Sequence, residues 1–287
     1  MRSHPKGHVA GSLLVGLLAL GCSAPPGPVP AGTSRLDVGV EAVEVEIWGH
    51  GEPWIVCVAG VGGSLHSFDP IREGLGARGT ALRYSRAGHD SSTYSHGPKD
   101  FEAILEELEG VVDAAGVPDG FVLVGHSFGG LITRAFATRH PGKVAGLLSI
   151  DPTFEDYLEV LEPLVLGARQ LERASFEGSD EQAFVDEYEA LFGVWDSPER
   201  WSEWFSYPAS VPHIVLTSTR IGRHPMRGSA EVMQARLEAQ ARTIARSSLA
   251  IQIPTAESGH GVHHQEPGLT LEALDRLLES LDPAPTR

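Results

Sequence analysis

The residues with the clearest chemical potential lie in the stretch LVGHSFGG at positions 123–130, where a serine stands between glycines directly after an apolar run. Glycine permits backbone conformations that other residues avoid. When a G-x-S-x-G pattern lies between a strand and a helix, its sharp turn exposes the serine hydroxyl as a nucleophile. A tight turn without chemistry is the alternative, and the flanking elements favour the nucleophile. We therefore identify Ser127 as a candidate nucleophile and the N–H of Phe128 as a candidate oxyanion donor.

A serine hydroxyl needs a nearby base to remove its proton, and histidine commonly fills that role. His260 lies in the stretch ESGHG at 257–261, in the loop after the last expected strand. Open α/β sheets place their sites at the carboxyl ends of parallel strands, where this loop begins. His263 and His264 are alternative bases, but they fall toward the start of the final helix. A metal site formed by the three histidines is less favoured, because no acidic or cysteine ligand is obviously placed beside them.

The base in turn needs a carboxylate that fixes its tautomer and stabilises the imidazolium. Asp151 directly follows the strand expected at 144–150, at the sheet edge that also presents the serine. The loop after the next strand, at 218–223, contains no acidic residue. Glu257 is the alternative acid, although its closeness in sequence to His260 makes good geometry between the two side chains difficult. The non-catalytic interpretation of Asp151 is a cap of the turn that follows it.

A second glycine-rich stretch, AGVGGS at 59–64, follows an apolar strand and supplies backbone N–H groups. The N–H of Val61 is the expected second oxyanion donor. Gly60 and Gly62, together with His126 beside the serine, are expected to contact the substrate. The stretch lacks the lysine of a phosphate-binding P-loop, which argues against a nucleotide site.

Short β-rich runs alternate with helical patterns from Val38 onward, which is typical of a mainly parallel sheet with helices on both faces. Residues 40–48 alternate acidic and apolar side chains, as expected of an outer antiparallel strand. At 101–115 apolar side chains recur at helical spacing, with glutamates on the opposite side. The remaining strands are expected at 55–59, 81–84, 121–124, 144–150, 213–217 and 249–253, and the remaining helices at 131–139 and 269–281.

The segment at about 152–211 differs from its surroundings, because helical patterns rich in glutamate alternate there with aromatic residues, including three of the five tryptophans. We expect it to form a helical cap over the mouth of a pocket, with Trp201 and Trp204 in contact with substrate. The alternative is a helical excursion whose aromatic side chains pack on one another. The folded domain is expected to occupy 37–287 as one unit that contains this insertion.

The first 22 residues are typical of an export signal, with a basic start, an apolar run and small residues at a cleavage point. Cys22 resembles the cysteine of a bacterial lipobox, which becomes the lipid-carrying first residue of a lipoprotein. We therefore expect an exported protein anchored to a bacterial membrane through Cys22, with plain secretion and an uncleaved anchor as alternatives. Residues 23–36 are rich in proline and glycine, as expected of a flexible linker.

The charge and cysteine content narrow the possible partners. The chain has 287 residues and a formal net charge of −16, and no cluster of lysine or arginine forms a basic stripe, which argues against nucleic acid. A small-molecule partner fits better. Only two cysteines are present. If Cys22 carries lipid, Cys57 has no disulfide partner, and its apolar surroundings predict a small buried hydrophobe.

Taken together, these residues resemble the α/β-hydrolase superfamily over about 40–281. The stretch YSRAGHDSS at 84–92 is similar to the loop that the family carries after its fourth strand. The order Ser127, Asp151, His260 is also the family's order of nucleophile, acid and base. Two features depart from the family pattern: AG at 59–60 stands where the family commonly has His-Gly, and the family's acid more often follows the next strand.

The resemblance implies a cofactor-free serine hydrolase in which Ser127 attacks an acyl carbonyl and His260 transfers the proton. Carboxylic esters of small to medium size are the expected substrates. Hydrolysis of amides, lactones, thioesters or lipids would use the same residues, as would perhydrolysis. These activities therefore remain alternatives. An alternative of another class is a surface-tethered binding protein that has kept the scaffold and lost turnover. His89 is interpreted as a solvated loop residue rather than a substrate contact.

Overall fold

The computed structural model describes residues 31–95, 99–247 and 249–281. They form a sheet of eight strands in the order β1-β2-β4-β3-β5-β6-β7-β8. Strand β2 pairs antiparallel with both β1 and β4, and all other neighbouring strands run parallel. The strands are β1(Gly32–Val38), β2(Glu41–Gly49), β3(Trp54–Val58), β4(Thr80–Ser85), β5(Phe121–His126), β6(Val144–Ile150), β7(His213–Ser218) and β8(Ala250–Thr255).

Helices connect the parallel strands, because strands that run the same way need a crossover between them. The α-helices are α1(Arg72–Gly76), α2(Phe101–Ala114), α3(Phe128–Arg139), α4(Tyr157–Leu161), α5(Ala168–Arg173), α6(Gln182–Trp195), α7(Trp201–Trp204), α8(Ala230–Ile244), α9(Val262–Gln265) and α10(Pro267–Leu281). Three 3₁₀ helices also occur in the described chain: η1(Leu65–Ile71), η2(Pro198–Arg200) and η3(Pro225–Arg227).

The sheet is covered on both faces, which confirms the expected α/β-hydrolase architecture. Successive side chains of a strand point to opposite faces, so Val56 and Val58 of β3 join one core and Ile55 and Cys57 join the other. Helices α2, α3 and α8 pack on the first face, and η1, α1, α9 and α10 pack on the second. Cys57 is fully buried, as expected, and burial raises the pKa of its thiol to about 12.

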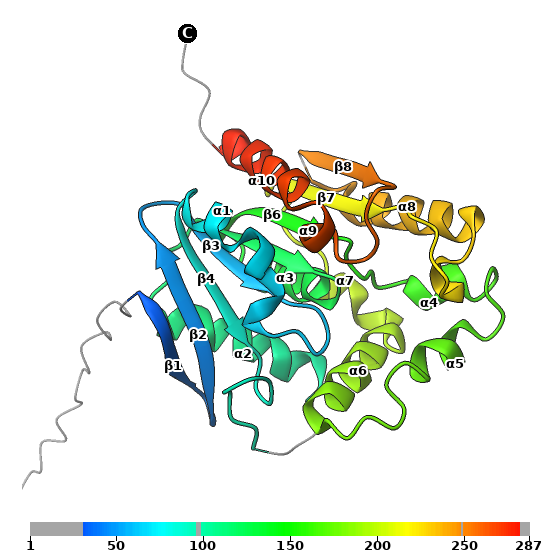
Figure 1. The fold of residues 1–287 in the computed structure, drawn as a ribbon, viewed down its shortest axis with the longest axis horizontal. Coiled ribbons are helices and arrows are strands. Elements are labelled where there is room, and N and C mark those ends of the chain that lie inside the picture. Colours follow the sequence, from blue (N-terminus) through cyan, green and yellow to red (C-terminus); the bar gives the residue numbers. More distant parts are fainter. Residues whose placement is uncertain (1–30, 96–98, 248, 282–287) are drawn as a thin grey trace, which may run out of the picture.

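Helices α4 to α7 all lie in the insertion between β6 and β7, and residues 152–211 are called the cap segment below. Figure 1 shows these helices gathered on one side of the sheet, in green to yellow-green. Aromatic rings pack on one another inside the cap segment: Tyr157 stacks on Trp195 with centroids 5.2 Å apart, and Phe176 stacks on Tyr188 at 4.6 Å. The insertion therefore has a core of its own, continuous with the first face of the sheet.

Strand β1 and helix α8 are among the elements that were not expected from the sequence. Strand β1 begins at Gly32, inside the stretch expected to be linker up to residue 36, so the folded part starts earlier and β2 is an interior strand. Helix α8 escaped detection because polar residues occupy part of its buried side. Arg236 and Gln240 are buried there with Val232 and Ala239, and this mixture removes the apolar periodicity that announces a helix.

The expected signal peptide at 1–22, the lipidation site Cys22 and most of the expected linker lie outside the described residues, which begin at residue 31. Within the described ranges, no helix is both long enough and apolar enough to cross a membrane.

Candidate active site

Ser127 is the single residue between β5 and α3, and its backbone adopts φ 53° and ψ −119°. Residues other than glycine rarely adopt this backbone conformation. The neighbouring glycines make the turn possible. A Cβ at Gly125 would lie 2.5 Å from the carbonyl oxygen of Gly129, and a Cβ at Gly129 would collide with the carbonyl oxygen of Val58. The spacing of the motif is therefore a steric requirement of the turn that carries the serine.

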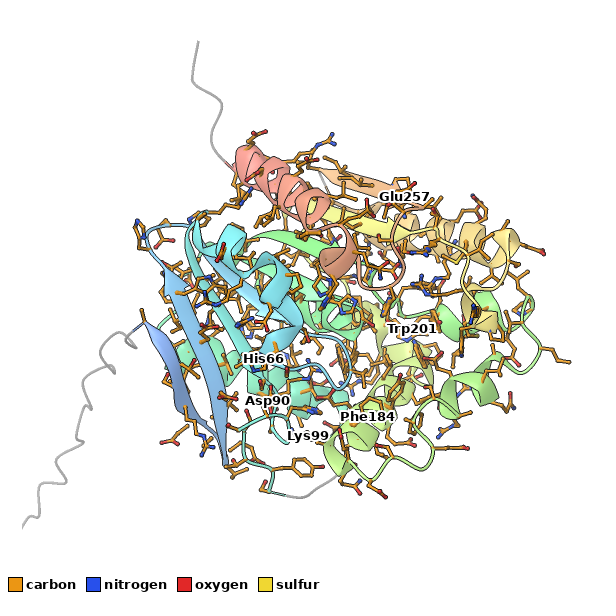
Figure 2. All side chains as sticks on the ribbon, viewed as in Figure 1. His66, Asp90, Lys99, Phe184, Trp201 and Glu257 are labelled. Carbon is orange, nitrogen blue, oxygen red and sulfur yellow. The ribbon has the colours of Figure 1, made fainter. Side chains whose placement is uncertain are left out.

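Asp151 and His260 come together although 109 positions separate them. Asp151 directly follows β6, also with a positive φ of 40°, and its side chain is fully buried. Its Oδ2 lies 2.6 Å from Nδ1 of His260, and its Oδ1 accepts a 3.2 Å bond from the N–H of Ser218. Glu257 lies on the loop after β8 (Figure 2). Of the two candidate acids, Asp151 is the one that contacts the histidine and leaves its Nε2 for a proton transfer.

Two guanidinium groups that the sequence reasoning missed surround Asp151. Arg227 of η3 donates a hydrogen bond to its Oδ2 and lies 3.3 Å from Nδ1 of His260. Arg236 of α8 has Nη2 3.8 Å from the same oxygen. Burial alone would raise the pKa of Asp151, but Arg227, the hydrogen bond with His260 and Arg236 together hold it below its usual range. Asp151 is therefore ionised at neutral pH.

The loop after β3 lies against the serine. A Cβ at Gly60 would stand 3.1 Å from Cβ of Ser127. The N–H of Gly63 donates to the carbonyl oxygen of Gly60 at 3.0 Å, which closes a tight turn. Gly62 in this turn has φ +64°, and a Cβ there would lie 2.5 Å from the ring of Phe184 on α6 (Figure 2). Residues 60–63 are called the oxyanion turn below, and position 62 of this turn requires glycine for both conformation and space.

Both amides expected to stabilise an oxyanion are available. In the described part of the chain, the N–H of Val61 donates no hydrogen bond. Phe128 is the first residue of α3, where a helix leaves its N–H groups without intrahelical acceptors. The N–H of Gly62, by contrast, is occupied, because it donates to the carboxylate of Glu187 at 2.8 Å. Gly62 lines the cavity, as expected of a substrate contact, but its N–H is not available to a ligand.

Glu187 of α6 ties the cap segment to the oxyanion turn. Besides Gly62, its carboxylate binds Nε and Nη2 of Arg86 at 2.6 and 2.8 Å and Nε2 of His89 at 3.0 Å. Arg86 also donates to the carbonyl oxygens of residues 59–60. Both members of this ion pair are buried. His89 is buried with them, so its interpretation as a solvated loop residue was wrong.

The candidate active site contains a cavity of about 550 Å³. The expected site residues Gly60, Val61, Gly62, His126, Ser127 and His260 all line it. The cap segment and the chain between β7 and β8 supply most of the remaining wall. Those wall residues are Thr153, Tyr157, Glu172, Ser175, Tyr188, Leu191, Trp195, His224, Met226, Arg227 and Arg236.

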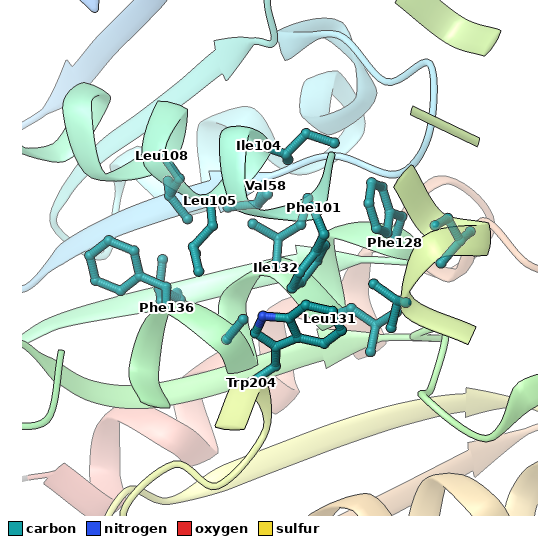
Figure 3. Close-up of a cluster of buried hydrophobic side chains, with 14 of the residues drawn as sticks. Val58, Phe101, Ile104, Leu105, Leu108, Phe128, Leu131, Ile132, Phe136 and Trp204 are labelled. Carbon is teal, nitrogen blue, oxygen red and sulfur yellow. The ribbon is translucent and has the colours of Figure 1, made fainter. Parts of the chain in front are cut away.

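The tryptophans expected to contact substrate do not line this cavity. The indole of Trp204 is buried among Phe101 and Leu131 in the first core (Figure 3), and its Nε1 donates to Glu102 at 2.7 Å. Trp201 donates to a backbone oxygen of α6. The tryptophan on the cavity wall is instead Trp195. The sequence located the aromatic segment correctly, but helical spacing alone could not separate rings that face the cavity from rings that face the core.

The remaining histidines pack around the base. Nε2 of His126 lies 3.1 Å from the carbonyl oxygen of His260, and burial lowers the pKa of His126 well below its usual value. His263 is fully buried and packs against the ring of His126, and burial lowers the pKa of His263 to about 3. His264 packs on His263 with centroids 4.4 Å apart. No group of three or more His, Cys, Asp or Glu side chains within the described ranges has the arrangement of a metal site.

This fold and this arrangement of residues agree with a match to a known family. The family model described as "alpha/beta hydrolase fold" matches residues 53–207, which is more than half of the chain. The chain belongs to the α/β-hydrolase family.

Several relatives and solved structures are similar to this chain. "Putative carbamate hydrolase RutD" of Azorhizobium caulinodans is 36% identical over 106 residues, which is 37% of this chain and 39% of the relative. "Uncharacterized protein YqjL" of Bacillus subtilis is 24% identical over 214 residues, 74% of this chain and 78% of the relative. The match to RutD thus spans about two fifths of that protein's length. The crystal structure of the enol-lactonase from Burkholderia xenovorans has a TM-score of 0.63 at 17% identity, covering 86% of this chain and all of that one, and shows the shared fold.

Proposed function

We propose that the protein is a serine hydrolase that cleaves carboxylic esters of small to medium size through an acyl-enzyme. The observation that carries the proposal is the 2.6 Å contact between Asp151 and Nδ1 of His260, in a site whose cavity is lined by both His260 and Ser127. Further support comes from the strained backbone of Ser127, which resembles the nucleophile elbow of this family. The similarity to RutD, named "putative carbamate hydrolase", is consistent with attack on an acyl carbon.

In the proposed reaction, Nε2 of His260 removes the proton of the Ser127 hydroxyl as the oxygen attacks the ester carbonyl carbon. The N–H groups of Val61 and Phe128 stabilise the negative charge on the carbonyl oxygen in the tetrahedral intermediate. Its collapse breaks the bond to the alcohol, which leaves with the proton from His260. Water, deprotonated by His260, then attacks the acyl-enzyme and releases the carboxylic acid. Asp151 stays ionised and stabilises the imidazolium in both halves of the reaction.

The test is covalent labelling of the full chain with a fluorophosphonate probe, read by intact mass and peptide mapping. We expect one adduct on Ser127 and hydrolysis of 4-nitrophenyl butyrate. The variant Ser127→Ala should form no adduct, and its kcat should fall by at least about 10⁴-fold. Ser67→Ala is the matched control, because Ser67 lines the same cavity outside the elbow, and it should label normally. A folded wild-type protein that neither labels nor hydrolyses esters contradicts the proposal and favours a binding protein.

We also propose that the protein is exported and anchored to a bacterial membrane by lipid on Cys22. The support is the sequence pattern of its first 22 residues. Fractionation of cells that express wild type and Cys22→Ser tests it. The variant should move from the membrane fraction to the soluble fraction, and unchanged partitioning contradicts lipid anchoring.

A further inference from the structure

Arg236 is a buried cation of the cavity wall whose hydrogen bonding is incomplete. The residue is 3% exposed, and its Nε is buried without a hydrogen-bond partner among the described residues. The nearest carboxylate oxygen, Oδ2 of Asp151, lies 3.8 Å from Nη2, which is an ion-pair distance but too long for a hydrogen bond. Buried charged donors normally have acceptors, because an unpaired one loses its hydration without compensation. The missing acceptor points to a ligand.

Asp151 cannot be that acceptor in the arrangement observed. Its Oδ2 already faces Nδ1 of His260 and the guanidinium of Arg227, and its Oδ1 accepts from the N–H of Ser218. The single negative charge of Asp151 is therefore matched by Arg227. Arg236 is a second positive charge at the site.

The other acidic side chain on the cavity wall does not cancel this charge by direct contact. Glu172 of α5 lines the cavity, and no ion pair joins it to Arg236 in the described chain. Burial raises the pKa of Glu172 and outweighs the opposing effect of Arg236. The raised pKa favours the uncharged form of Glu172. The cavity thus presents an unmatched guanidinium in a chain whose formal net charge is −16. Such a local field selects anions over neutral molecules.

We propose that Arg236 binds a carboxylate of the substrate, so that the preferred esters carry this carboxylate in addition to the bond that Ser127 attacks. A planar guanidinium offers parallel N–H donors that match the two oxygens of a carboxylate. Its face is covered by the ring of Tyr157, whose centroid is 5.3 Å from the guanidinium carbon. This stacking leaves the N–H edge as the part of Arg236 that can meet a ligand. The inference rests on the proposed hydrolase activity and specifies its substrate class.

Paired substrates test the preference. One series places the charge on the acyl chain: mono-4-nitrophenyl esters of adipic, pimelic and suberic acid, beside 4-nitrophenyl hexanoate, heptanoate and octanoate. A second pair places it on the alcohol: 4-acetoxybenzoate beside methyl 4-acetoxybenzoate. We expect kcat/KM to favour the charged member by about 10- to 100-fold in one of the two arms, the range for a charge-assisted hydrogen bond. The arm with the preference identifies which half of the ester carries the carboxylate.

The variant Arg236→Gln should lower kcat/KM for the charged ester far more than for its neutral partner, so that their ratio falls toward one. Arg236→Lys should keep part of the ratio, because it retains the charge without the planar donor pair. Arg242→Gln is the matched control, since Arg242 lies on the same helix with a side chain 56% exposed, paired with Asp156, and it should keep the wild-type ratio.

Wild-type measurements keep the inference testable if Arg236→Gln fails to fold. Adipate should inhibit hydrolysis of a neutral ester competitively, and adipamide should inhibit at least about 10-fold more weakly. Equal rates for charged and neutral esters in both arms, equal losses in Arg236→Gln, or equal inhibition by acid and amide would overturn the inference while leaving the hydrolase intact. Failure of every ester together with failure of Ser127 labelling instead overturns the proposed function.

Discussion

Two buried carboxylates in this molecule are each hydrogen-bonded to one arginine and one histidine, but their surroundings differ. Glu187 is fully engaged: it binds two nitrogens of Arg86, one of His89 and the N–H of Gly62, all within 3.0 Å. Its arginine also donates to two backbone carbonyl oxygens. The histidine of this group is 7% exposed. Every partner of Glu187 is thus held on several sides, as expected of a structural ion pair.

Asp151 stands in an open arrangement built from the same residue types. The side chain of His260 is 44% exposed and lines the cavity, as do Arg227 and Arg236. Asp151 itself has positive φ, which is rare outside glycine and clusters at functional sites. The polar groups around Glu187 bond to one another without a ligand. Among the described residues, the group around Asp151 by contrast leaves Nε2 of His260 and Nε of Arg236 without a hydrogen-bond partner. Residue type therefore does not separate a structural ion pair from a reactive one, whereas unfinished bonding beside a cavity does.

The largest expected effect is on turnover at Asp151. Asp151→Asn should lower kcat by about 10⁴-fold, because the amide neither selects the productive tautomer of His260 nor stabilises its protonated form. Glu257→Gln, the matched control, should keep kcat within about twofold. Stopped-flow or steady-state hydrolysis of a 4-nitrophenyl ester, with circular dichroism as a check of folding, measures both. A larger loss in Glu257→Gln would transfer the role of the acid to Glu257.

The second effect concerns stability rather than turnover. Glu187→Gln leaves the buried charge of Arg86 without its counterion, so the free energy of unfolding should fall by about 3–5 kcal/mol. Glu189→Gln, on the same helix, removes an ion pair with Arg173 that is about half exposed, and it should cost at most about 1 kcal/mol. Urea unfolding followed by tryptophan fluorescence compares them. Equal losses of unfolding free energy in the two variants would contradict the distinction between the buried ion pair of Glu187 and the exposed ion pair of Glu189.

The pH dependence of unfolding gives a third, somewhat smaller effect. Burial opposes ionisation of Glu187, yet Arg86 and His89 lower its pKa from 4.5 to about 2. A lowered pKa stabilises the folded state above the unfolded value, and this contribution is lost as the pH falls from about 4.5 to 2. The loss is on the order of 3 kcal/mol. Urea unfolding of wild type and Glu187→Gln across this window should converge as the pH falls, and parallel curves would contradict the assignment.

The smallest expected effect concerns a residue of the cap segment that contacts neither Glu187 nor Asp151. Trp204→Phe removes the hydrogen bond from Nε1 to Glu102 and keeps an aromatic ring against the core, so it should cost about 1 kcal/mol of stability. Its kcat/KM for any ester should stay within about twofold, whereas Trp195→Phe, on the cavity wall, should change KM. A changed KM in Trp204→Phe alone would return that indole to the substrate site.

The sequence predicted the parts of this molecule that depend on local patterns. Continuous apolar runs identified the buried parallel strands, which have no polar face to interrupt them. The glycines around Ser127 and in the oxyanion turn were informative because a Cβ at Gly125, Gly129 or Gly62 would collide with its neighbours. The placement of Asp151 and His260 at carboxyl ends of strands also made their meeting predictable, since a parallel sheet gathers those ends on one edge.

What the sequence did not predict depends on contacts between distant segments. Arg236 lies on the buried side of α8, where sequence periodicity expects apolar residues, so neither the helix nor its role was visible. His89 looked like a loop residue because its partner Glu187 is 98 positions away. Trp195 and Trp204 occupy the same segment with similar neighbours, and only the packing of the insertion directs one toward the cavity and the other into the core.

The bond from Glu187 to the oxyanion turn also has a consequence for how molecules enter and leave. If α6 swung away from the sheet, it would break the buried bonds of Glu187 to Arg86, His89 and the N–H of Gly62 together, which disfavours such an open form. Helix α6 therefore acts as a fixed wall. Cross-linking α6 to the oxyanion turn should accordingly leave turnover intact.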